Sequence, residues 1–87
     1  MKFLLHINYD RKLYSVVVHV ELLTSSIERY KIVSGKREVT LQSNRPDLRK
    51  RGLKHKRPYW RTVAGTFHNS HLREEIIKSL MKKVDNP

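Results

Sequence analysis

The sequence predicts an α+β fold, in which an antiparallel β-sheet of about five strands carries one C-terminal helix packed on one face. The sheet is predicted by two pairs of segments that alternate between apolar and polar residues, each pair joined by a short connection. The helix is predicted by apolar residues that recur at helical spacing near the C-terminus. The 87 residues have the length of one domain, so we expect residues 1–87 to share a single core.

The first hairpin is predicted from residues 2–9 and 13–21, where nearly every second residue is apolar or aromatic. A two-residue connection at Arg11-Lys12 would place Tyr9 opposite Tyr14. Each inward residue would then meet another inward residue, as a correct register requires. In this register His6 and His19 would be diagonal neighbours. We expect the hairpin although Arg-Lys is a poor sequence for a tight turn.

The second hairpin is predicted from residues 28–33 and 37–42, after a loop at residues 22–26. Gly35 occupies the first central position of the turn, which is the requirement of a type II′ turn. The register pairs inward residues again, with Ile32 opposite Val39.

A basic segment follows at residues 45–61, which read RPDLRKRGLKHKRPYWR. Pro46 is suited to start a short helical turn and Gly52 to end it. Residues 54–57 are expected to be extended, because the residue before a proline is steered away from the helical region. Residues 59–64 then read as a fifth strand.

The last element is a predicted amphipathic helix over residues 70–84, capped by Asn69 or Ser70. Its apolar positions are Leu72, Ile76, Ile77, Leu80, Met81 and Val84. An isolated helix of this length is marginal in water, so we expect it to cover the inward face of the sheet. The opposite face would remain open to solvent, with residents that include Lys2, His6, Ser15, His19, Arg29, Lys31, Thr40 and Arg61.

The charge distribution predicts an acidic partner. Eight of the nineteen Lys and Arg residues lie within residues 45–61 and only Asp47 opposes them, so this segment holds about +7 of the formal +11. Nucleic acid is the commonest such partner, because Lys and Arg neutralise phosphates and aromatic rings stack on bases. The predicted contacts are Arg45, Arg49, Lys50, Arg51, Lys54, Lys56, Arg57, Tyr59 and Arg61.

The neighbouring aromatic residues of this segment are expected to differ in role. Adjacent strand residues point to opposite faces, and Arg61 would not be buried unpaired. We therefore expect Trp60 in the core and Tyr59 on the surface, where it would stack on a base. No helix with base-reading residues is apparent, so weak sequence preference is expected.

Two other function classes stay open. The basic surface would also suit an adaptor that docks on an acidic protein, and a small basic ribonuclease would use a histidine as acid or base. No motif links any of the five histidines to a partner, so we expect no enzyme activity.

Phosphate-binding and dinucleotide-binding glycine motifs and the aromatic pattern of RNA-recognition sheets are absent. Without cysteine or a suitably placed acidic set, no metal or cofactor site is predicted.

The expected location is the cytoplasm. The lack of cysteine suits a reducing compartment, and the apolar run at residues 3–5 is too short for a signal peptide. No stretch approaches the roughly 20 apolar residues of a membrane span. These patterns distinguish neither DNA from RNA nor one oligomeric state from another.

Overall fold

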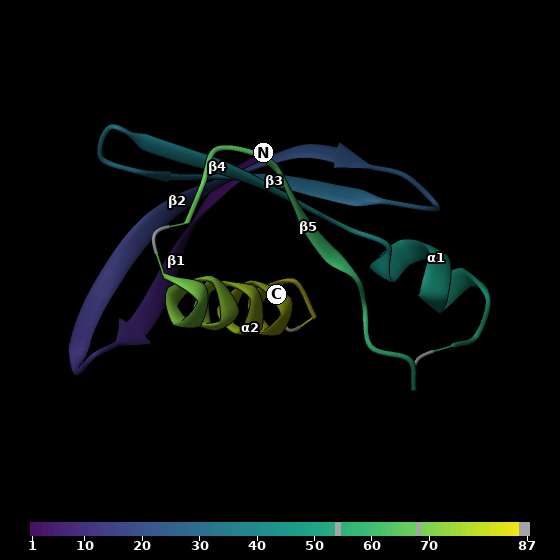
Figure 1. The fold of residues 1–87 in the computed structure, drawn as a ribbon. Helices are drawn as coiled ribbons and strands as arrows, with labels where there is room; N and C mark the ends of the chain where they lie inside the picture. Colours follow the sequence, from purple (N-terminus) through teal and green to yellow (C-terminus); the bar gives the residue numbers. More distant parts are fainter. Residues whose placement is uncertain (54, 68, 86–87) are drawn as a thin grey trace.

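Five antiparallel strands form one sheet in their order along the chain, and this sheet curves over helix α2 (Figure 1). The computed structural model describes residues 1–53, 55–67 and 69–85. The elements are β1 (Lys2–Tyr9), β2 (Lys12–Leu23), β3 (Glu28–Ser34), β4 (Arg37–Ser43), α1 (Arg45–Lys50), β5 (Trp60–Ala64) and α2 (Ser70–Asp85). The predicted α+β class, the strand arrangement and the C-terminal helix packed on one face are confirmed.

The first hairpin forms, but its predicted register is wrong by two residues. Tyr9 pairs with Lys12, and the turn consists of Asp10 and Arg11 with φ angles of 53° and 62°. Positive φ at both central residues is the signature of a type I′ turn, whose twist matches a hairpin, and Asp tolerates this conformation. Because the shift is even, the inward residues stay inward. His6 now faces Ser15 and His19 faces Lys2, so the two histidines are not diagonal neighbours.

The second hairpin has the predicted register, with Ile32 paired to Val39, and Gly35 takes a φ of +60°. Strand β2 runs on to Leu23, so the connection before β3 is shorter than predicted. It is closed by Thr24, whose Oγ1 accepts hydrogen bonds from the backbone N–H groups of Ser26 and Ile27 at 3.1 and 2.9 Å.

Helix α1 begins near Pro46 and ends before Gly52, as predicted. The N–H of Leu53 donates to the carbonyl of Leu48 at 2.8 Å, and the N–H of Gly52 donates to that of Arg49 at 3.1 Å. These two bonds form the Schellman motif that closes many helices.

The segment that leads from α1 to β5 differs in part from its prediction. Lys54 lies outside the described residues. The N–H of Lys56 donates to the carbonyl of Leu53 at 3.0 Å, so the chain turns here instead of running extended as predicted. Strand β5 begins at Trp60, one residue later than predicted.

Helix α2 packs against β1 and contributes Ile76, Ile77 and Leu80 to the core. Its N-terminus is capped by Asn69, whose Oδ1 accepts hydrogen bonds from the backbone N–H groups of His71 and Leu72. A predicted stop at residues 86–87 falls outside the described residues. Within the part of the chain that the structure describes, no helix has the length and apolar character needed to cross a membrane.

Candidate nucleic-acid interface

The face of the sheet that α2 does not cover carries two rows of polar side chains that run across the strands. Strand pairing aligns Lys2, His19, Lys31 and Thr40 in one row. It aligns Leu22, Arg29, Gln42 and Arg61 in the other. Neither row contains an acidic residue. Thr40, predicted to be exposed, is buried, because it sits in an inner strand between Lys31 and Ala64.

The second row presents guanidinium groups that keep their full charge. The Nε and Nη2 atoms of Arg29 donate to Oε1 of Gln42 at 3.0 and 2.8 Å. A neutral amide orients the guanidinium without neutralising it. Arg61, the strand partner of Gln42, is exposed. This row therefore offers positive charge to solvent beside the point where the basic segment rejoins the sheet.

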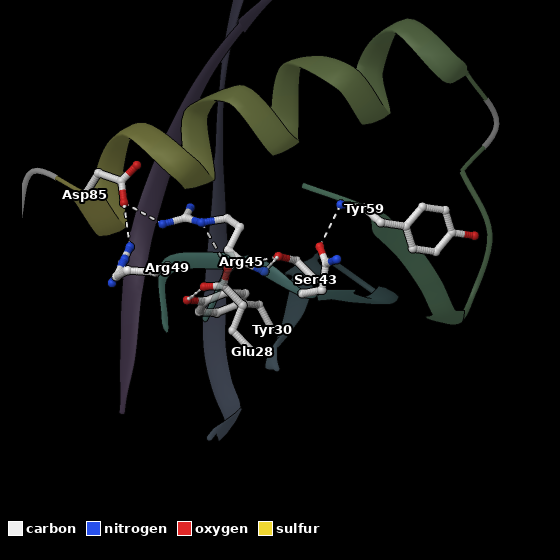
Figure 2. Close-up of polar contacts among 8 residues, drawn as sticks. Glu28, Tyr30, Ser43, Arg45, Arg49, Tyr59 and Asp85 are labelled. Atoms are coloured by element: carbon white, nitrogen blue, oxygen red, sulfur yellow. Dashed lines mark hydrogen bonds and ion pairs between the residues drawn. The ribbon is translucent and has the colours of Figure 1, made fainter. Parts of the chain in front are cut away.

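Tyr59 and Trp60 lie in opposite environments, as predicted. Tyr59 is 67% exposed, whereas Trp60 is 9% exposed and the centroid of its ring lies 6.4 Å from that of Tyr30. The backbone N–H of Tyr59 donates to Oδ1 of Asn44 at 2.8 Å, and the Tyr59 ring points away from the Arg45 cluster (Figure 2). Tyr59 is thus held by its backbone and mostly exposed to solvent.

Arg45 does not belong to this surface. It is 8% exposed, its Nε lies 3.1 Å from Oε2 of Glu28, and its Nη2 pairs with Asp85 (Figure 2). A guanidinium so enclosed is not open to a phosphate. The predicted phosphate contact does not fit this burial, because Arg45 is an internal ion-pair partner that joins α1 to β3 and to the end of α2.

Glu28 is the residue that sequence reasoning missed. It is buried on the inward face of β3 and accepts hydrogen bonds from the hydroxyls of Tyr30 and Ser43 at 2.6 and 3.0 Å. Glu28 lies two residues before Tyr30 and four before Ile32, so strand alternation places all three on the inward face of β3. This alternation could have predicted the burial of Glu28 from the sequence. A buried carboxylate requires a cation, and Arg45 supplies it. Burial and the hydrogen bond to Glu28 raise the pKa of the Tyr30 hydroxyl well above its usual range.

The remaining predicted cations of the basic segment lie at the surface. Arg49 is 64% exposed, with Nη2 3.5 Å from Oδ1 of Asp85, and Nη1 of Arg51 lies 3.4 Å from Oδ2 of Asp47. Exposed ion pairs of this kind contribute little, so both guanidinium groups can exchange a carboxylate for a phosphate. The others in the described residues are Lys50, Lys56 and Arg57.

The predicted contact residues lie in two separate places, one at the end of α2 and one at the start of β5. Arg49 lies beside Asp85 at the end of α2. Tyr59 and Arg61 instead line a small cavity together with Gln42 and Asn44, next to the second polar row. The base-stacking candidate thus adjoins the open face of the sheet, whereas Arg49 lies apart from it, beside the end of α2 (Figure 2).

The described histidines form no acid–base pair with a carboxylate. Nδ1 of His6 lies 3.0 Å from the hydroxyl of Ser15, and His68 falls outside the described residues. Among residues 1–53, 55–67 and 69–85, no group of three or more His, Cys, Asp or Glu side chains could hold a metal ion. The ribonuclease hypothesis gains no support from this arrangement.

Comparisons with known proteins add no assignment to this geometry: no family model, no curated protein and no solved structure matches the chain.

Proposed function

We propose that this protein is a small nucleic-acid-binding module that holds its partner mainly through the phosphate backbone. Phosphate contacts come from the exposed cations of the basic segment and from the second polar row, and Tyr59 stacks on a base. The proposed contacts in the described residues are Arg29, Arg49, Lys50, Arg51, Lys56, Arg57, Tyr59 and Arg61.

One observation carries the proposal, namely the open-face row that ends at Arg61, close to Tyr59. Arg29 and Arg61 are aligned on either side of Gln42, and the row holds no carboxylate that would compete with phosphate. An exposed tyrosine ring adjoins this row through the shared cavity. A cationic track next to an aromatic ring is the combination that binds single-stranded nucleic acid, because the track follows the backbone and the ring takes a base.

The burial of Arg45 removes one predicted contact, but the other described cations of the basic segment are exposed. A contact with four to six phosphates requires only part of the exposed set. Each neutralised phosphate releases counterions, so the binding constant must fall steeply with salt concentration.

The test is fluorescence anisotropy of labelled oligonucleotides, single-stranded and duplex, titrated with the whole chain at several salt concentrations. The logarithm of the binding constant should fall against the logarithm of salt concentration with a slope of roughly −4 to −5 on duplex DNA, and less on single strands. Undetectable binding to both DNA and RNA at low salt would overturn the proposal.

A second candidate, an adaptor for an acidic protein, is favoured by a different observation on the same face. Leu4, Val17 and Val33 are aligned across β1, β2 and β3 in a row that ends at Glu38 on β4, and Leu4 is exposed. An apolar row beside a basic one suits an acidic protein surface with apolar residues. In that case Leu4→Ser would weaken capture of the partner protein, whereas it should leave oligonucleotide binding unchanged.

A further inference from the structure

A small cavity lies where the basic segment returns to the sheet. Its volume is about 180 Å³, and it lies between the turn before β3, the end of β4 and the start of β5. The lining residues are Ile27, Gln42, Ser43, Asn44, Tyr59 and Arg61. Pockets for drug-sized ligands occupy roughly 300–1,000 Å³. This cavity is therefore suited to one heterocyclic ring, with the rest of a nucleotide outside it.

The walls of this cavity are held in place before any ligand arrives. Asn44 is fixed by the hydrogen bond from the Tyr59 N–H, and Gln42 by the two bonds from Arg29. Ile27 is fixed by the bond from its N–H to the Thr24 hydroxyl. A pre-formed wall reduces the entropy lost on binding.

The hydrogen bonds to Asn44 and Gln42 leave the amide NH2 group of each side chain over as a donor. The carbonyl oxygens of Asn44 and Gln42 are already accepting, which assigns the opposite end of each side chain as an NH2 group. No hydrogen bond to a described residue uses either NH2 group. Arg61 has donors only. The cavity thus offers hydrogen-bond donors beside an exposed aromatic ring and the aliphatic side chain of Ile27.

We propose that this cavity receives one unpaired keto base, namely uracil, thymine or guanine, stacked on Tyr59, and disfavours cytosine and adenine. This inference rests on the proposed function and adds a base preference at one position of an otherwise weakly selective surface. Keto bases present carbonyl acceptors where cytosine and adenine present an amino group. An amino group facing the donors of Asn44, Gln42 and Arg61 would leave both sides without partners, which is unfavourable.

The test compares binding of the whole chain to oligouridine and oligocytidine of about twelve nucleotides, a length in the range that small single-strand-binding folds cover. The two probes differ chiefly in the keto or amino group of the base. We expect the uridine strand to bind at least about fivefold more tightly, the lower end of what one correct base contact contributes. Deoxythymidine and deoxycytidine strands, run in parallel, show whether the sugar matters.

Two variants identify the cavity as the source of the preference. Asn44→Asp keeps an oxygen for the Tyr59 N–H but replaces the donor with an acceptor. The ratio of the two affinities should then fall to about one or reverse. Asn8→Asp places the same charge at an exposed site on β1 and should leave the ratio as in the parent chain.

The outcomes separate the two proposals. Equal binding of uridine and cytidine strands by the parent chain overturns the keto-base inference and leaves the nucleic-acid-binding proposal standing. A preference that persists in Asn44→Asp assigns it to another site and also overturns the inference. If no strand binds at low salt, both proposals fail together.

Discussion

The two ends of helix α1 carry the same kind of side chain in opposite environments. Arg45 is buried between Glu28 and Asp85, whereas Arg49 and Arg51, at the end of the same short helix, are mostly exposed. In the printed sequence all three belong to one run of cations. The difference shows that a run of cations in the sequence does not share one environment, because the faces of neighbouring elements decide which cations are internal.

The reason for the difference lies in the carboxylate that each arginine meets. Arg45 faces Glu28, which strand alternation places inside, and neither charge could be buried without the other. Arg49 and Arg51 meet Asp85 and Asp47 at the surface, where water screens the pair. The start of α1 therefore stabilises the fold, whereas the cations at its end stay exposed to solvent.

The largest expected effect is the loss of folding stability when the buried arginine is removed. Arg45→Ala should lower the free energy of unfolding by about 3–5 kcal/mol, because it leaves Glu28 as an uncompensated buried charge. The matched change Arg49→Ala should stay within about 0.5 kcal/mol. Urea denaturation of the two variants measures both values. A loss below about 1 kcal/mol for Arg45→Ala would show that Glu28 is not buried as described.

A second pair of variants separates the two adjacent aromatic residues. Trp60→Ala should remove about 3–5 kcal/mol of folding free energy through the cavity it leaves. Tyr59→Ala should leave the thermal midpoint nearly unchanged and weaken single-strand binding by about 1–3 kcal/mol, the contribution of one stacked base.

Trp60 fluorescence provides the check on that pair. In the free protein it should be blue-shifted and poorly quenched by acrylamide, because the ring is buried against Tyr30. A red-shifted emission that responds to added oligonucleotide would mean that Trp60, and not Tyr59, meets the bases.

The smallest expected effect concerns the pH dependence of the buried cluster. Burial, reinforced by the hydrogen bond to Glu28, raises the pKa of Tyr30 above its usual value. Above about pH 10 the unfolded chain loses this proton while the folded chain keeps it, so stability falls as pH rises. The contribution is at most about 1.4 kcal/mol per pH unit. Tyr30→Phe should flatten the decline of the unfolding free energy between about pH 9 and pH 11, relative to the parent chain. Equal slopes would contradict the account of the cluster.

Alternation and spacing were sufficient for the fold but not for its internal ion pairs. The period-two pattern identified both hairpins, and Asn69 and the helical spacing identified α2. The first register was missed because the positive φ angles of Asp10 and Arg11 were not anticipated from an Asp-Arg pair.

The burial or exposure of a site residue could be predicted from the sequence only where it follows from alternation within one strand. The outward position of Arg61 and the split between Tyr59 and Trp60 follow from strand alternation in β5. The burial of Arg45 depends on contacts with Glu28 and Asp85, which lie 17 and 40 residues away in the sequence. The cavity at Asn44 likewise needs three separate segments to meet. No local pattern contains that information.

The proposal that the exposed cations at the end of α1 contact phosphates is tested by the salt dependence of oligonucleotide binding. The variant with Arg49, Lys50 and Arg51 replaced by alanine should flatten the slope on duplex DNA by about 2–3. The control variant replaces Lys12, Lys36 and Arg37, exposed residues at the far ends of the hairpins, and changes the net charge equally. It should leave the slope nearly unchanged. Equal flattening by both variants would contradict the claim, because binding would then follow net charge alone and not this surface.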